Sequence, residues 1–163
     1  MSNARNIANL LVKNSSPMVS IRNNSDQGIS ATTWTTVTLD TEIIDTQNNF
    51  ASNVFTVPDV GQYFIIATLE VECSDADELV RTSMKFRKKP SGGSYADVPG
   101  TEINSYKAHD ADESFTRMSV TSTYMYTSAV SDEWLVQAYA NSGGGSMTLK
   151  GQNCTFVAFK IIG

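Results

Sequence analysis

The sequence predicts an all-β protein, an antiparallel jelly-roll sandwich of two sheets with a short N-terminal arm or helix. Three observations carry this prediction. Runs rich in threonine, valine and aromatic residues recur along the 163 residues, with Gly, Asn, Asp or Pro between them. Several runs alternate apolar and polar residues with the period of two that strands have. No helical pattern separates these runs, which favours a sandwich over an α/β fold.

The N-terminal segment is the only helical candidate. Ser2 can cap a helix over residues 2–12 that places Ile7, Leu10 and Leu11 on one face, and Pro17 ends it. Such a short helix is marginal alone, so a disordered tag and a peptide that orders on a partner both stay open. Apolar residues would be wasted on a free tail, which favours docking. We expect a docking arm over residues 1–16 and a jelly-roll domain over residues 17–163.

The first half of the jelly-roll domain is expected to form strands over residues 18–23, 34–39 (continuing over 41–44), 50–55 and 63–73. The last of these is the most informative, because positions 63, 65, 67, 69, 71 and 73 are all apolar. The opposite face begins with Phe64 and Ile66 and then turns polar. An antiparallel sheet normally keeps one face in water, so a second apolar face predicts a partner, which we take to be another copy of the chain.

The second half is expected to form strands over residues 80–87, 95–98, 118–126, 134–140, 147–150 and 154–162, with an exposed loop at 105–114. The strands at 80–87 and 118–126 have polar outer faces and are expected to share one sheet. The last strand resembles 63–73 because Phe156 and Phe159 fall on opposite faces, both of them apolar. We therefore expect the strands 63–73 and 154–162 to pair in the other sheet.

Composition and motifs argue against several functions. The net charge of −5 argues against nucleic-acid binding, and no apolar run is long enough to span a membrane. The first residues show no secretory signal. The single His109 has no nucleophile partner in a known motif, and pairs drawn from Glu70, Glu72, Glu102 and Glu113 are what any acidic protein offers. We expect no enzyme activity and no cofactor.

Metal and thiol chemistry leave alternatives open. Acidic loops carry Asp75, Asp77, Asp110 and Asp112, whose oxygen atoms suit calcium, although solvated loops explain them equally well and the spacing is not that of a helix–loop–helix site. Cys73 and Cys154 lie far apart in sequence and could form a disulfide or remain buried free thiols.

Two groups of surface residues are candidates for recognition. Lysine and arginine on an outer strand commonly prevent edge pairing, or they dock an acidic partner. Tyrosines in or near the polar loops can stack on sugars, or can belong to the core or its rim. The basic residues are Arg81, Lys85, Arg87, Lys88 and Lys89, and the tyrosines are Tyr95, Tyr106 and Tyr139.

Short motifs resemble a known family. Phe55, Gly61 and Tyr63 with the apolar strand behind them are similar to the hallmark of complement globular heads, which share a trimeric jelly roll with tumour necrosis factor. Residues 131–136 and the closing residues 154–163 resemble later strands of those heads. Trp34-Thr-Thr-Val37 resembles the versions found in bacteriophage virion proteins, and residues 4–10 resemble the start of some marine phage tail-fibre proteins.

This resemblance implies a homotrimer packed about a threefold axis, and some complement-type heads bind calcium near the trimer apex. It also implies a virion protein, assembled in the host cytoplasm and docked to other virion proteins through residues 1–16, that acts in appendage assembly or in attachment to a host-surface glycan or protein. The alternatives are a capsid-decoration protein of the cement or head-fibre type and a secreted cytokine-like or complement-like ligand. The expected trimer-interface residues are Tyr63, Phe64, Ile66, Phe156 and Phe159.

Overall fold

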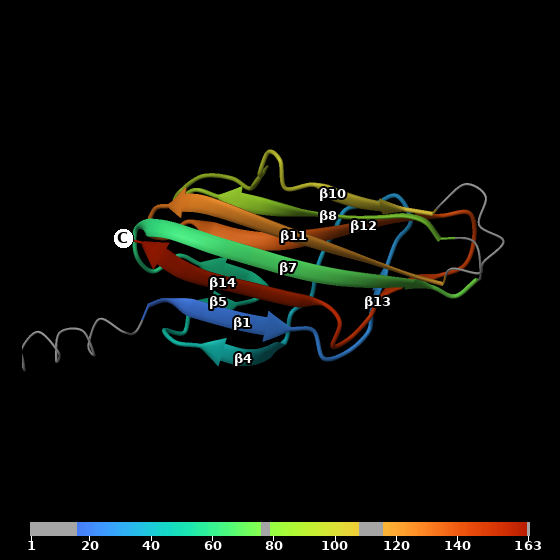
Figure 1. The fold of residues 1–163 in the computed structure, drawn as a ribbon, viewed down its shortest axis with the longest axis horizontal. Helices are drawn as coiled ribbons and strands as arrows, with labels where there is room; N and C mark the ends of the chain where they lie inside the picture. Colours follow the sequence, from blue (N-terminus) through green and yellow to red (C-terminus); the bar gives the residue numbers. More distant parts are fainter. Residues whose placement is uncertain (1–15, 76–78, 108–115, 163) are drawn as a thin grey trace, which may run out of the picture.

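The computed structural model describes residues 16–75, 79–107 and 116–162, which form fourteen β-strands in two antiparallel sheets (Figure 1). The prediction of an all-β sandwich is confirmed. The first sheet has the strand order β2-β13-β7-β14-β1-β4, with β11 on the other edge of β7. Its strands are β1 (Met18–Arg22), β2 (Gln27–Ile29), β4 (Thr41–Asp45), β7 (Gly61–Cys73), β11 (Arg117–Ser128), β13 (Met147–Leu149) and β14 (Thr155–Ile162).

The second sheet has the strand order β10-β8-β12-β6-β5, with β9 beside β8 and β3 beside β12. The long strands β8 and β12 pair along almost their whole length, from Glu133 opposite Lys89 to Ser142 opposite Leu79. The strands of this sheet are β3 (Thr35–Thr36), β5 (Phe50–Ala51), β6 (Val54–Thr56), β8 (Leu79–Lys89), β9 (Ala96–Asp97), β10 (Ile103–Tyr106) and β12 (Glu133–Ser142).

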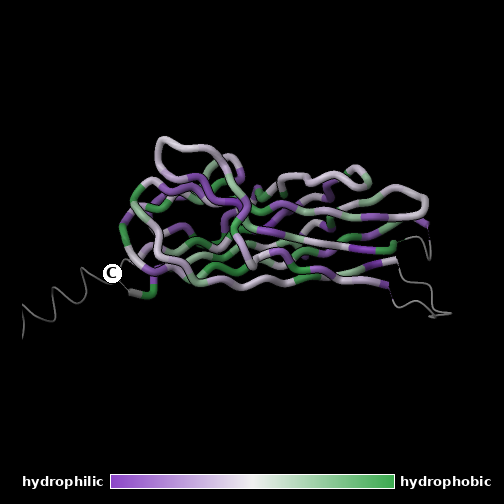
Figure 2. Tube along the Cα trace, turned by 90° about the horizontal axis from the view of Figure 1, so that it is seen from above, coloured by the Kyte–Doolittle hydropathy of each residue, from purple (hydrophilic) through white to green (hydrophobic). Residues whose placement is uncertain are grey.

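The core lies between the two sheets and is built by strict alternation along the long strands. On β7, the side chains at positions 63, 65, 67, 69, 71 and 73 are at most 1% exposed, and the intervening ones are not buried. Phe156 contributes the inner face of β14 and contacts the rings of Phe50, Phe55 and Phe86. Figure 2 shows apolar residues recurring along strands of both layers. Burial of large side chains on this scale is the main stabilising term of the fold.

Strand pairing confirms one predicted partnership and corrects two others. β7 and β14 are neighbours, as predicted, with Phe159 opposite Phe64. The strand predicted over 118–126 pairs with β7 in the first sheet and not with 80–87, because a polar outer face does not identify the sheet to which a strand belongs. Residues 34–44 do not form one strand, because β3 pairs with β12 and β4 pairs with β1 in the other sheet.

Tyr63 provides a test of the core through its pKa. Burial raises the pKa of this phenol to about 12, and its hydroxyl donates to the Asp59 carbonyl oxygen at 2.9 Å. The folded-state pKa lies above the ordinary value of 10, so the protonated Tyr63 phenol contributes to the stability of the fold. This contribution is complete below pH ~10 and is lost as the pH rises toward 12. Absorbance titration at alkaline pH should show two phenols that ionise late, because burial also raises the pKa of Tyr95, and Tyr63→Phe should remove one of them. Tyr106→Phe, at an exposed site, should leave both late steps in place.

Candidate functional site

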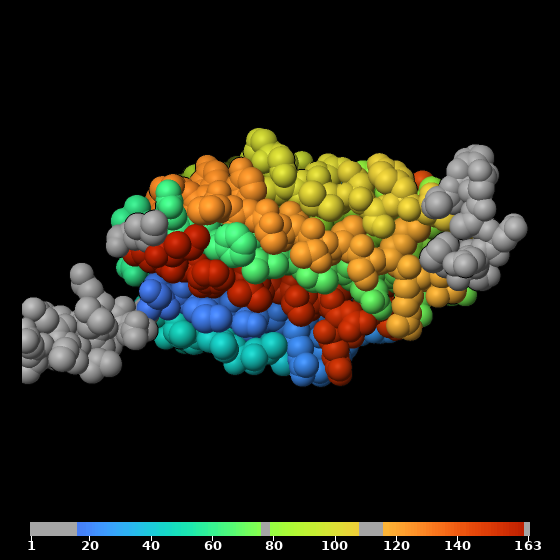
Figure 3. Space-filling view, in the orientation of Figure 1, coloured from blue at the N-terminus to red at the C-terminus, as the bar shows by residue number. Residues whose placement is uncertain are grey.

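The outer face of the first sheet is the surface that the sequence analysis singled out. Side chains of β11, β7, β14, β1 and β4 lie on it as adjacent bands, and no described segment crosses it (Figure 3). All of these strand pairs are antiparallel. Because directly paired residues of an antiparallel sheet point to the same side, the register of the strands fixes which side chains share this face.

Two rows of apolar side chains cross this face. In the first row, Phe64 lies between Met125 on β11 and Phe159 on β14, and Phe159 lies opposite Met18 on β1. In the second row, Ile66 lies opposite Val157, and the row continues through Ser20 to Ile44 on β4. We call these apolar residues the outer patch, which comprises Met18, Ile44, Phe64, Ile66, Met125, Val157 and Phe159.

The outer patch is exposed in the single chain. Met125 is 58% exposed, Ile44 is 40% exposed, and the other members are half-buried by one another. The rings of Phe64 and Phe159 pack with centroids 5.6 Å apart. A sheet face in contact with water is normally polar, and a contiguous apolar area of this kind is typical of an interaction surface.

The structure separates the expected interface residues into two groups. Phe64, Ile66 and Phe159 belong to the outer patch, so their interface role stays a prediction. Tyr63 and Phe156 do not belong to it, because both point into the core and are at most 1% exposed. The expectation for these two residues is therefore corrected. The docking residues Ile7, Leu10 and Leu11 lie outside the described residues.

The opposite end of the same face is charged. Arg117 on β11 reaches Glu72 at 2.8 Å and Glu70 at 3.5 Å. Lys150 contacts Glu72 at 2.9 Å and also the carboxylate of Asp26. We call Asp26, Glu70, Glu72, Arg117 and Lys150 the charged end. Between it and the outer patch, the hydroxyls of Thr68 and Thr121 share a hydrogen bond at 3.0 Å.

Hydrogen bonds within the charged end shift several pKa values. The ammonium of Lys150 lowers the pKa of Asp26, with help from the Gly151 N–H, and it also lowers the pKa of Glu72, with help from Arg117. The same contacts raise the pKa of Lys150 and of Arg117. The sequence did not reveal this network, because its members come from four separate segments.

A substitution at Lys150 should reverse these shifts. Lys150→Met should raise the pKa of Glu72 and Asp26 toward ordinary values, as measured by carboxyl-carbon NMR during an acid titration. A depressed folded-state pKa contributes stability above the unfolded value, which is lost as the pH falls through the folded value. The free energy of unfolding of the variant should therefore change less with pH in the acid range than that of the wild type. Lys160→Met, at the other end of β14, should keep both pKa values low, and equal shifts in the two variants would contradict the assignment.

The acidic loops and the two cysteines were the candidates for metal and thiol chemistry. Of the proposed calcium ligands, Asp75 is exposed, while Asp77, Asp110 and Asp112 lie outside the described residues, as does His109. Within the described ranges, no group of three or more His, Cys, Asp and Glu residues is placed to hold a metal. Cys73 and Cys154 are buried free thiols, which settles the alternative left open above. Burial raises the pKa of the Cys154 thiol.

The basic residues of β8 do not protect a sheet edge. The strand lies between β10 and β12, and its cations are held in ion pairs. Lys88 points inward and pairs with the buried carboxylate of Asp132 at 2.7 Å. Sequence alternation could not anticipate this, because a cation on the inner face is unusual.

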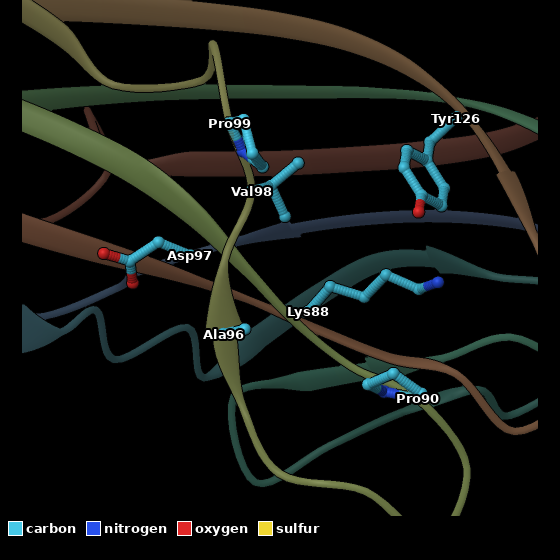
Figure 4. A pocket seen from close by; sticks show the side chains of 7 residues that line it. All are labelled: Lys88, Pro90, Ala96, Asp97, Val98, Pro99 and Tyr126. Carbon is cyan, nitrogen blue, oxygen red and sulfur yellow. The ribbon is translucent and has the colours of Figure 1, made fainter.

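A small pocket of about 170 Å³ opens beside this strand (Figure 4). The ammonium of Lys88 lies on the Tyr126 side, 4.5 Å from the ring centroid, and the carboxylate of Asp97 points away from it. Both charged groups are engaged in ion pairs, and most of the surface that lines the pocket is apolar. Its lining consists of Lys88, Pro90, Ala96, Asp97, Val98, Pro99 and Tyr126.

Comparison with solved structures gives the fold its name. The chain superimposes on the globular domain of zebrafish complement 1qA with a TM-score of 0.61 and 13% identity, covering 89% of this chain and 97% of that one. The fold is the complement-head and tumour necrosis factor-type jelly roll. The Eiger tumour necrosis factor of S. frugiperda matches with a TM-score of 0.64, 10% identity and coverage of 90% and 92%. Murine APRIL matches with a TM-score of 0.63, 11% identity and coverage of 89% and 98%.

The sequence itself gives no such match. No family model matches the chain, and no curated protein matches its sequence. The neighbours are complement and cytokine proteins, so the fold prediction is confirmed and the bacteriophage assignment stays a prediction. Within the described residues, no helix is long and apolar enough to cross a membrane.

Proposed function

We propose that the protein is a non-enzymatic homotrimeric binding module and that it serves as a structural component of a bacteriophage virion. The outer patch carries the trimer proposal. Its two rows extend across β11, β7, β14, β1 and β4, and they are apolar at positions where an exposed strand would carry polar residues. A second and a third copy of the chain would bury these rows.

Physical arguments favour copies of the chain over an unrelated partner. Burial of apolar surface contributes roughly 25 cal/mol per Å², so covering the outer patch in every protomer stabilises an assembly. In an assembly with closed rotational symmetry, the outer patch of every copy is covered by a neighbouring copy. An open arrangement would leave a patch uncovered at its end and would continue into a filament. The fold shared with complement and tumour necrosis factor proteins supports a closed trimer.

The virion assignment is supported by two stretches of sequence. Trp34-Thr-Thr-Val37 and residues 4–10 resemble phage virion and tail-fibre proteins. In this role residues 1–16 dock the trimer to other virion proteins, and the jelly roll acts in appendage assembly or in host-surface attachment. Three copies per trimer and many trimers per particle would convert weak single contacts into firm attachment. A capsid-decoration protein would use the same docking arm.

The neighbours favour a second candidate function, a secreted cytokine-like or complement-like ligand. Both functions use the same trimer, so the assembly state cannot separate them. Location can: a virion protein is found in purified particles at a fixed ratio to the capsid protein, and a secreted ligand is found in the medium.

Four measurements test the proposal. Sedimentation of the purified chain should give a species of three chain masses, and a monomer at micromolar concentration would contradict the trimer. Antibodies against the protein should detect it in purified particles. Removal of residues 1–16 should abolish its incorporation while leaving the trimer intact, and retained incorporation would exclude the docking arm. Incubation with host envelope glycans should release no product, since release would contradict the non-enzymatic assignment.

A further inference from the structure

The outer face of the second sheet carries a row of aromatic rings that the proposed trimer does not use. Trp34 precedes β3, Tyr139 lies on β12 and Tyr106 ends β10. The centroids of Trp34 and Tyr139 are 5.3 Å apart, and the guanidinium of Arg81 lies 5.0 Å from the Tyr139 ring and 5.6 Å from the Tyr106 ring. We call Trp34, Arg81, Tyr106 and Tyr139 the aromatic strip. It faces away from the first sheet and its outer patch.

Hydrogen bonds hold the central cation of the strip in place. Arg81 donates from Nε to the Ser83 hydroxyl at 2.7 Å and from its guanidinium to the Asn104 side-chain oxygen at 2.6 Å. It also pairs with Glu102 at 2.8 Å. The guanidinium therefore lies between two rings in a fixed orientation, so a ligand would meet a pre-formed surface and would not pay the full cost of ordering it.

The cations that β8 directs to this face are all held in ion pairs, which indicates the kind of ligand. β8 directs four cations outward, and three carboxylates, Asp97, Glu102 and Glu133, pair with them. A polyanion such as nucleic acid needs an excess of unpaired cations, which this face does not provide. An added peptide strand cannot pair with β8 or β12, because both strands are already paired on both edges.

We propose that the aromatic strip binds an uncharged oligosaccharide. A sugar ring presents an apolar C–H face, which packs on aromatic side chains, and a rim of hydroxyls, which need hydrogen-bond partners. Tyr106, which is 61% exposed, supplies the most open ring, and the half-buried Trp34, whose ring centroid lies 4.2 Å from the Lys85 ammonium, supplies another. Glu102, Asn104 and Arg81 supply planar polar groups beside them, and the Glu102 side chain is 47% exposed. The row of rings would lie along successive sugar residues of an extended chain.

The ligand class and the site rest on the proposed function, because they specify how the protein would attach to a host surface. The binding itself requires neither a trimer nor a virion. It is tested on the purified full-length chain with uncharged hexasaccharides of glucose, mannose and N-acetylglucosamine, and with an acidic heparin hexasaccharide. Of the two tryptophans, Trp134 is fully buried, so fluorescence changes on titration report on Trp34. Isothermal titration gives the affinity.

At least one uncharged hexasaccharide should bind and alter the fluorescence, and Tyr106→Ala should weaken its binding about tenfold. Arg81→Met should also weaken it, whereas Val130→Ala, at an exposed site in a turn, should not. Circular dichroism identifies any variant that fails to fold. Binding of the acidic hexasaccharide alone, equal affinity of wild type and Tyr106→Ala, or no binding by any uncharged member would each overturn the proposal. Sedimentation of the same samples shows whether the chain is trimeric, so a failure of the trimer proposal can be distinguished from a failure of sugar binding.

Discussion

Phe64→Asp should convert the trimer into folded monomers. In the free chain this side chain is half-exposed on the outer face, so an aspartate there meets water and leaves the core unchanged. In the assembly, each copy would bury an unpaired carboxylate within the outer patch, which costs about 3 kcal/mol or more per site. The dissociation constant should rise by at least about two orders of magnitude. Sedimentation velocity at micromolar concentration measures this directly.

Two further variants make this test specific. Ile66→Asp lies in the second row of the outer patch and should dissociate the assembly in the same way. Val60→Asp places the same charge at a residue that is 61% exposed in the turn before β7, and it should remain trimeric. Circular dichroism must show native β structure in all three variants. An intact Phe64→Asp trimer would show that another surface holds the copies together.

The sequence predicted the two-sided apolar pattern but could not resolve its geometry. The period of two along residues 63–73 identified β7 and its buried face, and the similar pattern at 154–162 identified its neighbour. The last strand is apolar at both its odd-numbered and its even-numbered positions. The pattern alone therefore does not indicate which of Phe156 and Phe159 faces outward. The register decides this, because Phe159 lies opposite Phe64, while Phe156 lies opposite Ala67 and points inward.

Contacts between distant segments were beyond sequence reasoning. The strand over 118–126 was assigned to the wrong sheet, because its Thr and Ser outer face resembles that of 80–87 and long-range pairing alone distinguishes the two. The second half of β10 falls in the loop expected over residues 105–114, because four residues with little apolar character give no strand pattern. Of the aromatic strip, the sequence indicates sugar stacking only for Tyr106 and Tyr139, and the stacking of Arg81 between them appears only in the folded chain.

The ion pair between Lys88 and Asp132 explains why one basic residue of β8 points inward. Its side chains are 15% and 3% exposed, and the Lys88 ammonium also lies 4.5 Å from the Tyr126 ring centroid. Asp132 accepts a second hydrogen bond from the Ala129 N–H at 2.9 Å and so closes the turn between β11 and β12. Without Lys88, the buried carboxylate would keep only that neutral donor.

Lys88→Met should therefore lower the free energy of unfolding by about 3 kcal/mol, because an unpaired buried charge is left behind. Lys88→Met combined with Asp132→Asn should recover most of this loss, since no charge then remains in the site. Lys89→Met breaks a more exposed pair with Glu133, whose side chains are 31% and 27% exposed, and should cost less than about 1 kcal/mol. Urea unfolding measures the stability of all three variants. The protein concentration must be matched, because assembly contributes to the apparent stability. Equal losses in Lys88→Met and Lys89→Met would show that burial does not distinguish the two ion pairs.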